Sequence, residues 1–559
     1  MGVIQDYCRT DFTSYEDFYQ HYTVNIPEEF NFAYDVADRL AREQPDKTAL
    51  VWCDDKSGEK RISFSEIKRV SDKTANALRA LGVGKGDAVM VMLKGRYEYW
   101  YITIALHKLG ALLIPATHML SVKDLVYRIK AADVRMILAV GDGPLCDKID
   151  EAQALTGDTL RTKGLLLDKR AGYTAFNEAV EAASESFTRP AGAEAPRNGD
   201  RMIAYFTSGT TGMPKMVAHD YTYPLCHLTT AKFWHGLDET DLHFTVADTS
   251  WAKASWGKLY GQWLCGAAVF VYDYDTKFIP TDFLALIDKY QITSFCAPPT
   301  IYRFLIKEDL SGYSLKSLRN CTIAGEPLNP EIYNRWLDAT GIKLREGYGQ
   351  TECTVIVATT VWTEPKPGSM GLPMPGTHCV VLDEDGGACD PGEEGEICMT
   401  VAGAENRPYG LFMGYYKDEA MTAKAFAGGV YHTGDTVWRD EDGYVWFRGR
   451  NDDIIKSSGY RIGPFEVESA LVEHPAVLET AITGVPDPDR GYNVKATVVL
   501  AKGWTPSDAL AKELQEHVKK VTAPYKYPRV VEFVTELPKT INGKIRRVAI
   551  REQDGASNQ

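Results

Sequence analysis

Short apolar runs alternate with amphipathic helical patterns through the first half of the chain. Strand-like runs stand at residues 48–53, 88–93, 111–115 and 136–140, and helical patterns at 65–81, 97–109 and 122–132. Parallel strands need this alternation, because a helix must carry the chain back across a face of the sheet between them. The same pairing recurs at 268–290 and 294–308. The chain therefore predicts an α/β fold of doubly wound parallel sheets covered on both faces.

The pattern of predicted strands and helices changes twice towards the C-terminus. Short strands broken by Gly, Asp and Pro at 379–382, 395–400 and 443–448 predict a small barrel-like or antiparallel subdomain. Beyond Arg450, a helix from about 464, strands at 480–485, 496–500 and 529–534, and a helix at 507–521 predict a compact α+β domain. We therefore divide the chain into a large domain at 1–450 and a small one at 451–559, with the boundary at 451–453.

Composition narrows the class of protein. With 559 residues the chain is too long for one hydrophobic core, and its net charge of −14 argues against nucleic acid as a partner. No stretch of apolar residues is long enough to span a membrane. The eleven cysteines show no CxxC and no Cys/His pairing at metal spacing, so they receive no metal-binding role. The N-terminal segment lacks the apolar core of a signal peptide, and a cytoplasmic enzyme is expected.

The segment TSGTTGMPK at 207–215 follows an apolar strand-like run. Glycines in such a loop let successive backbone N–H groups turn towards one anion, and hydroxyls and an ammonium add further donors. A phosphate chain is the expected ligand, although the segment lacks the GK[ST] of a Walker A loop. The candidate phosphate-binding residues are Thr207, Ser208, Gly209, Thr210, Thr211, Gly212 and Lys215.

Four more polar segments carry candidate chemistry. GEPLNPE (325–331) and EGYGQTE (346–352) follow strand-like runs, where an α/β sheet opens its binding crevice. A purine can stack on Tyr348, and the carboxylate of Glu352 suits Mg²⁺. YHTGD (431–435) ends in Asp435, which can accept both hydroxyls of a ribose. Taken singly, each is equally compatible with a polar turn, and Lys544 in PKTINGKIRR (538–547) with a solvated tail.

Together these motifs resemble one family over nearly the whole chain. TSGTTGMPK, YGQTE, YHTGD, GRNDDIIKSSGYRIG and PKTINGKIRR stand in the order found in the AMP-forming adenylating enzymes, which comprise acyl-CoA synthetases, luciferases and peptide-synthetase adenylation domains. PDPDRG (486–491) and VKKVTAPYKYPR (518–529) look most like the medium-chain acyl-CoA synthetase branch. The resemblance implies that ATP and a carboxylic acid form acyl-AMP and pyrophosphate, and that CoA then displaces AMP.

The resemblance also implies residue roles. The 207–215 loop would bind the β- and γ-phosphates, Thr351 the α-phosphate, and Glu352 with Thr210 the Mg²⁺. Lys544 would catalyse adenylation, together with Thr351 and Glu352. Nucleotide contacts are expected from Gly325, Glu326, Pro327, Glu346, Gly347, Tyr348, Gly349, Gln350, Asp435 and Arg450. Asp452 matches the hinge about which the small domain of this family rotates. The rotated domain would bind CoA with Ser458, Gly459, Tyr460, Arg461, Arg490, Lys519, Tyr525, Lys526 and Tyr527.

The acyl pocket is expected at Trp234, Trp251, Lys253, Trp256 and Thr354. Thr354 stands where relatives with longer acyl chains have glycine, which removes volume. Lys253 adds a cation that a long aliphatic tail would not tolerate without a partner. We therefore expect a short or branched acid of roughly three to six carbons.

Three alternatives stay open at this point. The acyl group could pass to a carrier protein, as in amino acid-activating domains. Asp248 is compatible with this alternative, because such a domain is expected to have an Asp in this segment that holds the α-amine of its substrate. The acid could be aromatic, or the chain could be an inactive nucleotide sensor. A homodimer is also left open.

Overall fold

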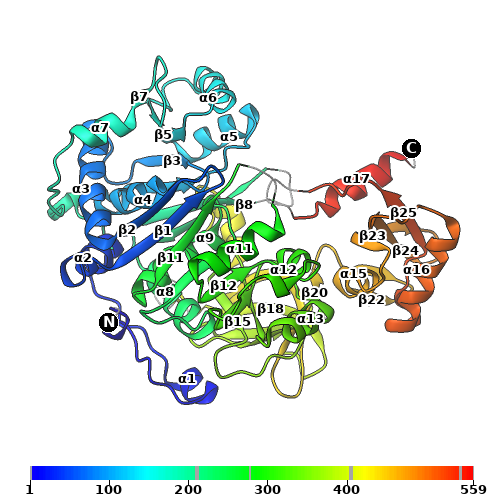
Figure 1. Cartoon of the computed structure of the whole chain (residues 1–559). Coiled ribbons are helices and arrows are strands. Elements are labelled where there is room, and N and C mark those ends of the chain that lie inside the picture. Colours follow the sequence, from blue (N-terminus) through cyan, green and yellow to red (C-terminus); the bar gives the residue numbers. More distant parts are fainter. Residues whose placement is uncertain (1–2, 208–212, 276–277, 402–406, 540–543, 558–559) are drawn as a thin grey trace.

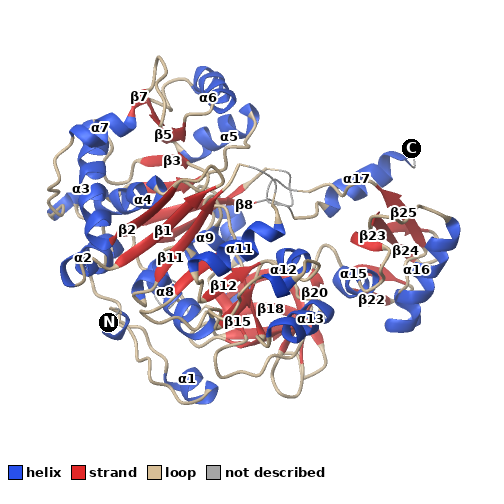
Figure 2. Ribbon diagram, viewed as in Figure 1, coloured by secondary structure: helices blue, strands red, loops and turns tan. Residues whose placement is uncertain are grey.

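The structure is a computed structural model that describes residues 3–207, 213–275, 278–401, 407–539 and 544–557. It has a large domain built on two sheets and a small C-terminal domain at its side (Figures 1 and 2). This confirms the predicted mixed α/β fold with a large and a small domain. The exact boundary at residue 451 stays a prediction.

The first sheet contains seven strands. Their order is β7 (Thr174–Ala175), β6 (Thr162–Leu166), β5 (Val134–Val140), β3 (Ala88–Met92), β4 (Leu112–Pro115), β8 (Arg201–Thr207) and β9 (Lys215–Asp220). All pairs are parallel except the β8–β9 hairpin. The five residues of β3, Ala-Val-Met-Val-Met, are all buried, because helices cover both faces of this sheet.

The second sheet has thirteen strands. Its parallel part runs β14 (Leu344–Gly349), β13 (Asn320–Ile323), β12 (Ser294–Ala297), β10 (Leu242–Thr245), β11 (Ala268–Asp273) and β1 (Thr48–Asp54), and β2 (Glu59–Ser63) forms the antiparallel edge. Its other part is antiparallel and contains β15 (Val355–Ala358), β16 (Ser369–Pro373), β20 (Val445–Arg450), β19 (Val430–Arg439), β18 (Glu394–Thr400) and β17 (Cys379–Leu382). The predicted antiparallel subdomain is thus present, but it continues the parallel sheet through β14 and β15 rather than closing separately.

Helices fill the layers around the sheets. The helices α5 (Val122–Ala132) and α6 (Gly143–Thr156) cover the outer face of the seven-stranded sheet. Between the two sheets lie α3 (Phe64–Ala80) and α4 (Glu98–Leu109), with every residue of α4 buried. The far face of the large sheet is covered by α11 (Pro280–Tyr290), α12 (Pro299–Leu305) and α13 (Pro330–Thr340). Shorter helical segments complete the large domain: η1 (Ile4–Asp6), α1 (Tyr15–His21), η2 (Ala33–Ala37), α2 (Asp38–Glu43), α7 (Phe176–Ala182), η3 (Gly192–Glu194), α8 (Tyr223–Leu228), η4 (Thr229–Trp234), α9 (Ala252–Gly257), α10 (Tyr260–Leu264), η5 (Leu310–Gly312), α14 (Glu419–Ala425) and η7 (Ala427–Gly429).

The small domain has its own sheet and core. Its elements are β21 (Ile455–Ser457), β22 (Tyr460–Ile462), α15 (Pro464–Val472), β23 (Val477–Asp487), β24 (Gly491–Leu500), α16 (Asp508–Val521), η8 (Pro524–Lys526), β25 (Val530–Val534) and α17 (Arg547–Ser557). It touches the large domain through polar contacts: Asn329 donates to Ser469 at 2.8 Å, and Arg448 bonds Glu466 at 2.7 Å. Such an interface can be exchanged for another at little cost, unlike a large apolar one.

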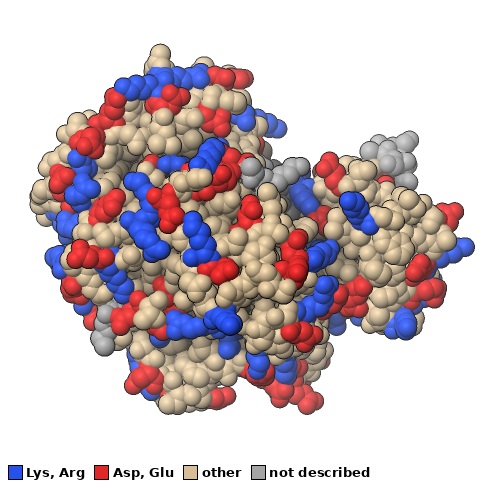
Figure 3. Space-filling model, in the orientation of Figure 1, with Lys and Arg blue, Asp and Glu red and all other residues tan. Residues whose placement is uncertain are grey.

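Charge is mixed on the visible surface. Lys/Arg and Asp/Glu side chains are interspersed over the face shown in Figure 3, without a large patch of one sign. Among the described residues no helix has the length and apolar character needed to cross a membrane.

Candidate active site

Strand β14 lies between the two tryptophans Trp234 and Trp256 and the polar side chains that meet at Asp435. Side chains alternate along a strand, and the two glycines of EGYGQTE fall on the same face. A Cβ atom at Gly347 would lie 2.5 Å from Trp234, and one at Gly349 would lie 2.9 Å from Trp256 and 2.2 Å from the Thr354 carbonyl. Only glycine therefore allows the two tryptophans to pack against this strand.

The next residues of the motif reach Asp435. The carboxylate of Asp435 accepts hydrogen bonds from the Tyr348 hydroxyl and, at 2.6 Å, from the Gln350 amide. Arg450, which stands opposite Asp435 in the β19–β20 ladder, donates to it at 3.3 Å. Burial raises the pKa of Asp435, and Arg450 acts against that rise. The motifs YGQTE, YHTGD and GRNDD are thus joined by one carboxylate.

The base of the glycine-rich loop lies beside Glu352. Thr207 pairs with Lys215 at the end of the β8–β9 hairpin, while Ser208, Gly209, Thr210, Thr211 and Gly212 lie outside the described residues. The Lys215 ammonium stands 5.0 Å from the centre of the Tyr415 ring, and the Tyr415 hydroxyl donates to Glu352 at 3.0 Å. Burial raises the pKa of Glu352, and Lys215 is among the cations that oppose it.

Thr351 is held from behind by a buried histidine. The Nε2 of His219 lies 2.7 Å from the Thr351 carbonyl and acts as the donor, because a carbonyl oxygen can only accept. Burial lowers the pKa of His219 to about 4, so the ring is neutral near pH 7. His219 is a positioning residue for the segment that carries Thr351 and Glu352.

The 324–327 loop faces the same space. Gly325 has a φ of +105°, and nothing lies within 4 Å of the position of a Cβ there, so the loop has an open side. Glu326 accepts from Thr300 at 2.7 Å, and the Lys253 ammonium donates to the Ala324 carbonyl at 2.7 Å. Pro327 follows in this loop. The geometry is compatible with the predicted adenine wall, which stays a prediction.

Glu346, the first residue of the EGYGQTE motif, is buried behind the 325–328 loop. It is buried and accepts from the Leu328 amide, so it anchors the 325–328 loop from inside. Its other carboxylate oxygen has no hydrogen-bond partner, and burial raises its pKa to about 8. A direct contact between Glu346 and the nucleotide stays untested.

This burial predicts a pH-dependent stability. Between the ordinary glutamate pKa and about 8, the unfolded chain ionises Glu346 while the folded chain keeps it protonated, so wild-type stability falls as pH rises. One pKa unit corresponds to about 1.4 kcal/mol, which makes the loss a few kcal/mol at most. Glu346→Gln should remove this dependence. The difference between the melting temperatures of the variant and the wild type should increase in favour of the variant from about pH 5 to pH 8. A difference that does not change with pH would contradict a buried, protonated Glu346.

Lys544 lies within electrostatic reach of the site. Its charge acts on Asp435 and on Lys253, lowering the pKa of both. The segment 540–543 before it lies outside the described residues, and α17 begins three residues after it. The small domain therefore presents the predicted catalytic lysine to the large domain in this arrangement. Asp452, the predicted hinge, is half-exposed in the turn between β20 and β21.

The predicted CoA-binding residues divide into two groups. Tyr460 is 50% exposed and stacks on Tyr525 with ring centres 4.1 Å apart, and Arg490 donates to Ser458 beside Gly459. The others are engaged by carboxylates or packed on rings: Arg461 with Glu384, Lys526 with Glu466, and Lys519 with Glu516 and the Tyr527 ring. The first group forms an exposed aromatic and cationic surface. The second must exchange partners before it can bind a ligand.

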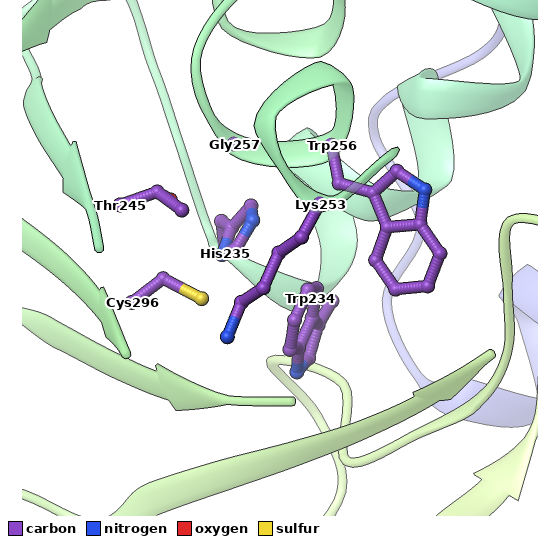
Figure 4. Close-up of a pocket in the computed structure, with 7 residues that line it drawn as sticks. All are labelled: Trp234, His235, Thr245, Lys253, Trp256, Gly257 and Cys296. Atoms are coloured by element: carbon purple, nitrogen blue, oxygen red, sulfur yellow. The ribbon is translucent and has the colours of Figure 1, made fainter. Parts of the chain in front are cut away.

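A narrow cavity adjoins the 324–327 loop. Its walls are Trp234, His235, Thr245, Lys253, Trp256, Gly257 and Cys296, and it is too tight for a water molecule (Figure 4). The Lys253 side chain extends between Cys296 and Trp234, and burial lowers its pKa. Three of the five residues predicted for an acyl pocket, Trp234, Lys253 and Trp256, thus meet here.

The other two do not line this cavity. Thr354 borders a second one, with Tyr22, Val24, Cys226, Thr229, Val355, Pro375, Gly376, Thr377 and Tyr409. The Thr354 side chain points to Gly410 and Cys226, because its backbone carbonyl packs on Gly349. Trp251 is the residue before α9 begins, and it lines neither of the two cavities. Trp256 and the Thr354 backbone both pack against Gly349, but Trp256 lines only the first cavity and Thr354 only the second.

Several site residues have no signal in a single sequence. Tyr415 and Cys296 stand in ordinary apolar surroundings, and only pairing between distant strands brings them to the site. His219 could have been singled out as a histidine inside an apolar strand that follows the glycine-rich loop.

Comparisons with known proteins agree with this geometry. The family model described as AMP-binding enzyme matches residues 37–416, and that of the AMP-binding enzyme C-terminal domain matches 466–544. The chain is 42% identical to mouse acyl-coenzyme A synthetase ACSM3, mitochondrial, over 97% of this chain and 94% of that protein. It is 43% identical to human acyl-coenzyme A synthetase ACSM4, mitochondrial, over 95% and 91%. Anthranilate CoA ligase AuaEII, solved with anthranoyl-AMP, superposes with a TM-score of 0.86 at 29% identity, over 95% and 99% of the two chains. The chain therefore belongs to the AMP-binding enzyme family, as an acyl-CoA synthetase close to the medium-chain branch.

Proposed function

We propose that this acyl-CoA synthetase activates short or branched carboxylic acids of roughly three to six carbons, since selectivity must come from the shape of the pocket. The observation that carries the proposal is the narrow cavity beside the 324–327 loop. Trp234 and Trp256 pack against two glycines of strand β14, and both line this cavity. The cavity is too tight for a water molecule in this arrangement, so its walls must move to admit any acyl group, and the movement required is smallest for a short acid.

The geometry supports roles for the nucleotide contacts. We propose that the Asp435 carboxylate, with Arg450 beside it, accepts hydrogen bonds from the ribose hydroxyls, and that Tyr348 faces the base. Thr207 and Lys215 frame the loop for the β- and γ-phosphates. Lys544 supplies positive charge where negative charge grows on the phosphoryl oxygens as pyrophosphate leaves.

A magnesium ion fits the same end of the site. Glu352 offers carboxylate oxygen, the ligand type that hard cations prefer, and Tyr415 fixes one of its oxygens. When bound beside the triphosphate, the ion would neutralise charge on the departing pyrophosphate. Thr210, the second predicted ligand, lies outside the described residues.

Thioester formation requires a different surface of the small domain. We propose that rotation about Asp452 withdraws Lys544 and turns Tyr460, Tyr525 and Arg490 to CoA. The polar nature of the present interface supports such an exchange. Cations suit the CoA phosphates, and an exposed aromatic pair offers a face to its adenine.

Initial rates with a panel of acids test the proposed substrate class. With ATP, Mg²⁺ and CoA, 2-methylbutyrate and propionate should give kcat/KM values at least about tenfold above that of octanoate, because the closed cavity rejects extra methylenes. Benzoate belongs in the panel, since the AuaEII ligase carries an aromatic acyl-adenylate. A clear preference for octanoate or benzoate would overturn the proposal.

Two further proposals concern context. We propose free CoA rather than a carrier protein as acyl acceptor, and acyl-CoA formation from free CoA alone tests this.

We also propose a cytoplasmic location, although the named relatives are mitochondrial. Subcellular fractionation distinguishes the two locations. Light scattering in solution would show whether the chain forms a homodimer.

A further inference from the structure

Three potential metal ligands meet on one face of the antiparallel half of the large sheet. Glu396 and Cys398 are two residues apart on β18, and their ligand atoms lie close together although the ladder with β19 shifts register between them. His432 on β19 stands directly opposite Cys398 in the ladder. Ile397 and Met399 point to the opposite face, into the core of this half. Thirty-four positions separate Cys398 from His432, which is why sequence spacing assigned no metal role to the cysteine.

The distances between donor atoms suit a tetrahedral ion. His432 Nδ1 lies 3.0 Å from Glu396 Oε2 and 3.7 Å from Cys398 Sγ, and all three ligand atoms lie within 4.8 Å of one another. With typical zinc bond lengths, tetrahedral geometry puts nitrogen about 3.4 Å from oxygen and about 3.6 Å from sulfur. Small side-chain rotations therefore suffice to place one ion between the three atoms.

Burial is graded across the cluster. Cys398 is fully buried, whereas the side chain of Glu396 is 20% exposed and that of His432 is 37% exposed. An ion can enter from the His432 side, where water can supply a fourth ligand. A thiol, an imidazole and a single carboxylate select a borderline-soft divalent cation such as Zn²⁺ over Mg²⁺, which prefers oxygen ligands.

The cluster is connected to the nucleotide site. The second oxygen of Glu396 accepts from the Gly434 amide at 2.7 Å, and Gly434 precedes Asp435. His432 belongs to the same YHTGD segment. An ion that takes Glu396 and His432 as ligands pulls on the bulge of β19 around Gly434, next to Asp435.

We propose that Glu396, Cys398 and His432 form a binding site for one divalent transition cation of the zinc class, and that its occupation weakens nucleotide binding through the bulge at Gly434. On binding, the thiol of Cys398 loses its proton to solvent and ligates as thiolate. The metal site itself does not depend on the proposed function, whereas the coupling rests on the proposed ribose contact of Asp435.

Cobalt substitution tests the metal site directly. Reduced, metal-free full-length protein is titrated with Co²⁺, and near-ultraviolet absorption reports a thiolate–cobalt bond. Wild type should saturate at one equivalent, and Zn²⁺ should displace the cobalt. Cys398→Ser and His432→Gln should lose this absorption. The matched control is Cys379→Ser on the neighbouring strand β17, which should keep it. A wild type without the absorption, or a Cys398→Ser protein that retains it, would overturn the site.

Calorimetry with ATP tests the coupling separately. Wild type loaded with one zinc and freed of excess metal should bind ATP several-fold more weakly than the metal-free protein, and His432→Gln treated identically should show no difference. Equal affinities of the loaded and metal-free wild type would overturn the coupling. If neither form bound ATP, the proposed nucleotide site would fail instead, while the cobalt result would still decide the metal site.

Discussion

Replacing Lys544 with alanine is expected to slow acid-dependent pyrophosphate release by about 10²- to 10³-fold, the usual loss when one fixed donor to a developing oxyanion is removed. The lysine already acts on Asp435 in this arrangement of the domains, so its charge lies near the nucleotide. The reaction of supplied acyl-AMP with CoA should be little affected, because we propose that it uses the other surface of the small domain, around Tyr460 and Arg490. Separate assays of the two half-reactions measure this split.

Lys539 provides a matched control for this substitution. It lies five residues before Lys544 and pairs with Glu479 of its own domain at 2.7 Å. Lys539→Ala should leave both half-reactions near the wild-type rates. Unchanged pyrophosphate release in Lys544→Ala would show that the catalytic role is wrongly assigned. An equal loss in both half-reactions would indicate a general structural defect.

Replacing Trp256 with alanine is expected to shift the acid preference towards longer chains. The Trp256 ring lines the cavity at Lys253 and packs against Gly349, so its removal enlarges that cavity. Each additional methylene that fits contributes about 0.8 kcal/mol, or roughly fourfold. Two or three of them would raise kcat/KM for octanoate, relative to propionate, by roughly 15- to 60-fold. Steady-state rates with both acids measure the shift.

Stability must be followed in the same experiment. Truncation of a buried tryptophan costs about 3 to 5 kcal/mol, and Trp256 is 6% exposed. Trp256→Phe is a milder second variant and should give a smaller shift in the same direction. Trp251→Ala is the control, because Trp251 lines neither cavity. An unchanged acid preference in folded Trp256→Ala and Trp256→Phe proteins would show that Trp256 does not limit the length of the acyl chain.

Local pattern predicted much of the fold. The helix at 122–132 and the strand at 379–382 were predicted to the residue, since apolar periodicity and flanking caps are local signals. Strand order could not be predicted, because it depends on distant pairings. An example is β1 beside β11, more than two hundred residues later in the chain. For the same reason, the antiparallel strands could not be seen to continue the parallel sheet through β14 and β15.

The candidate site was predictable where motifs carry it. Asp435, Arg450, Gln350 and Tyr348 meet as the motif order suggested. The cavity was less predictable, because Trp234, Trp251 and Trp256 look alike in the sequence, and only the folded structure shows that Trp251 does not line it. Cross-strand neighbours such as Cys398 and His432 were beyond reach, since their proximity follows from ladder register alone.

Product analysis with a single acid tests the central claim most directly. The purified protein is incubated with ATP, Mg²⁺ and 2-methylbutyrate, first without CoA and then with it, and products are identified by mass spectrometry. We expect enzyme-bound 2-methylbutyryl-AMP and pyrophosphate in the first step, and 2-methylbutyryl-CoA with AMP in the second. Formation of ADP and phosphate, or an acyl-adenylate that free CoA does not consume, would contradict the account.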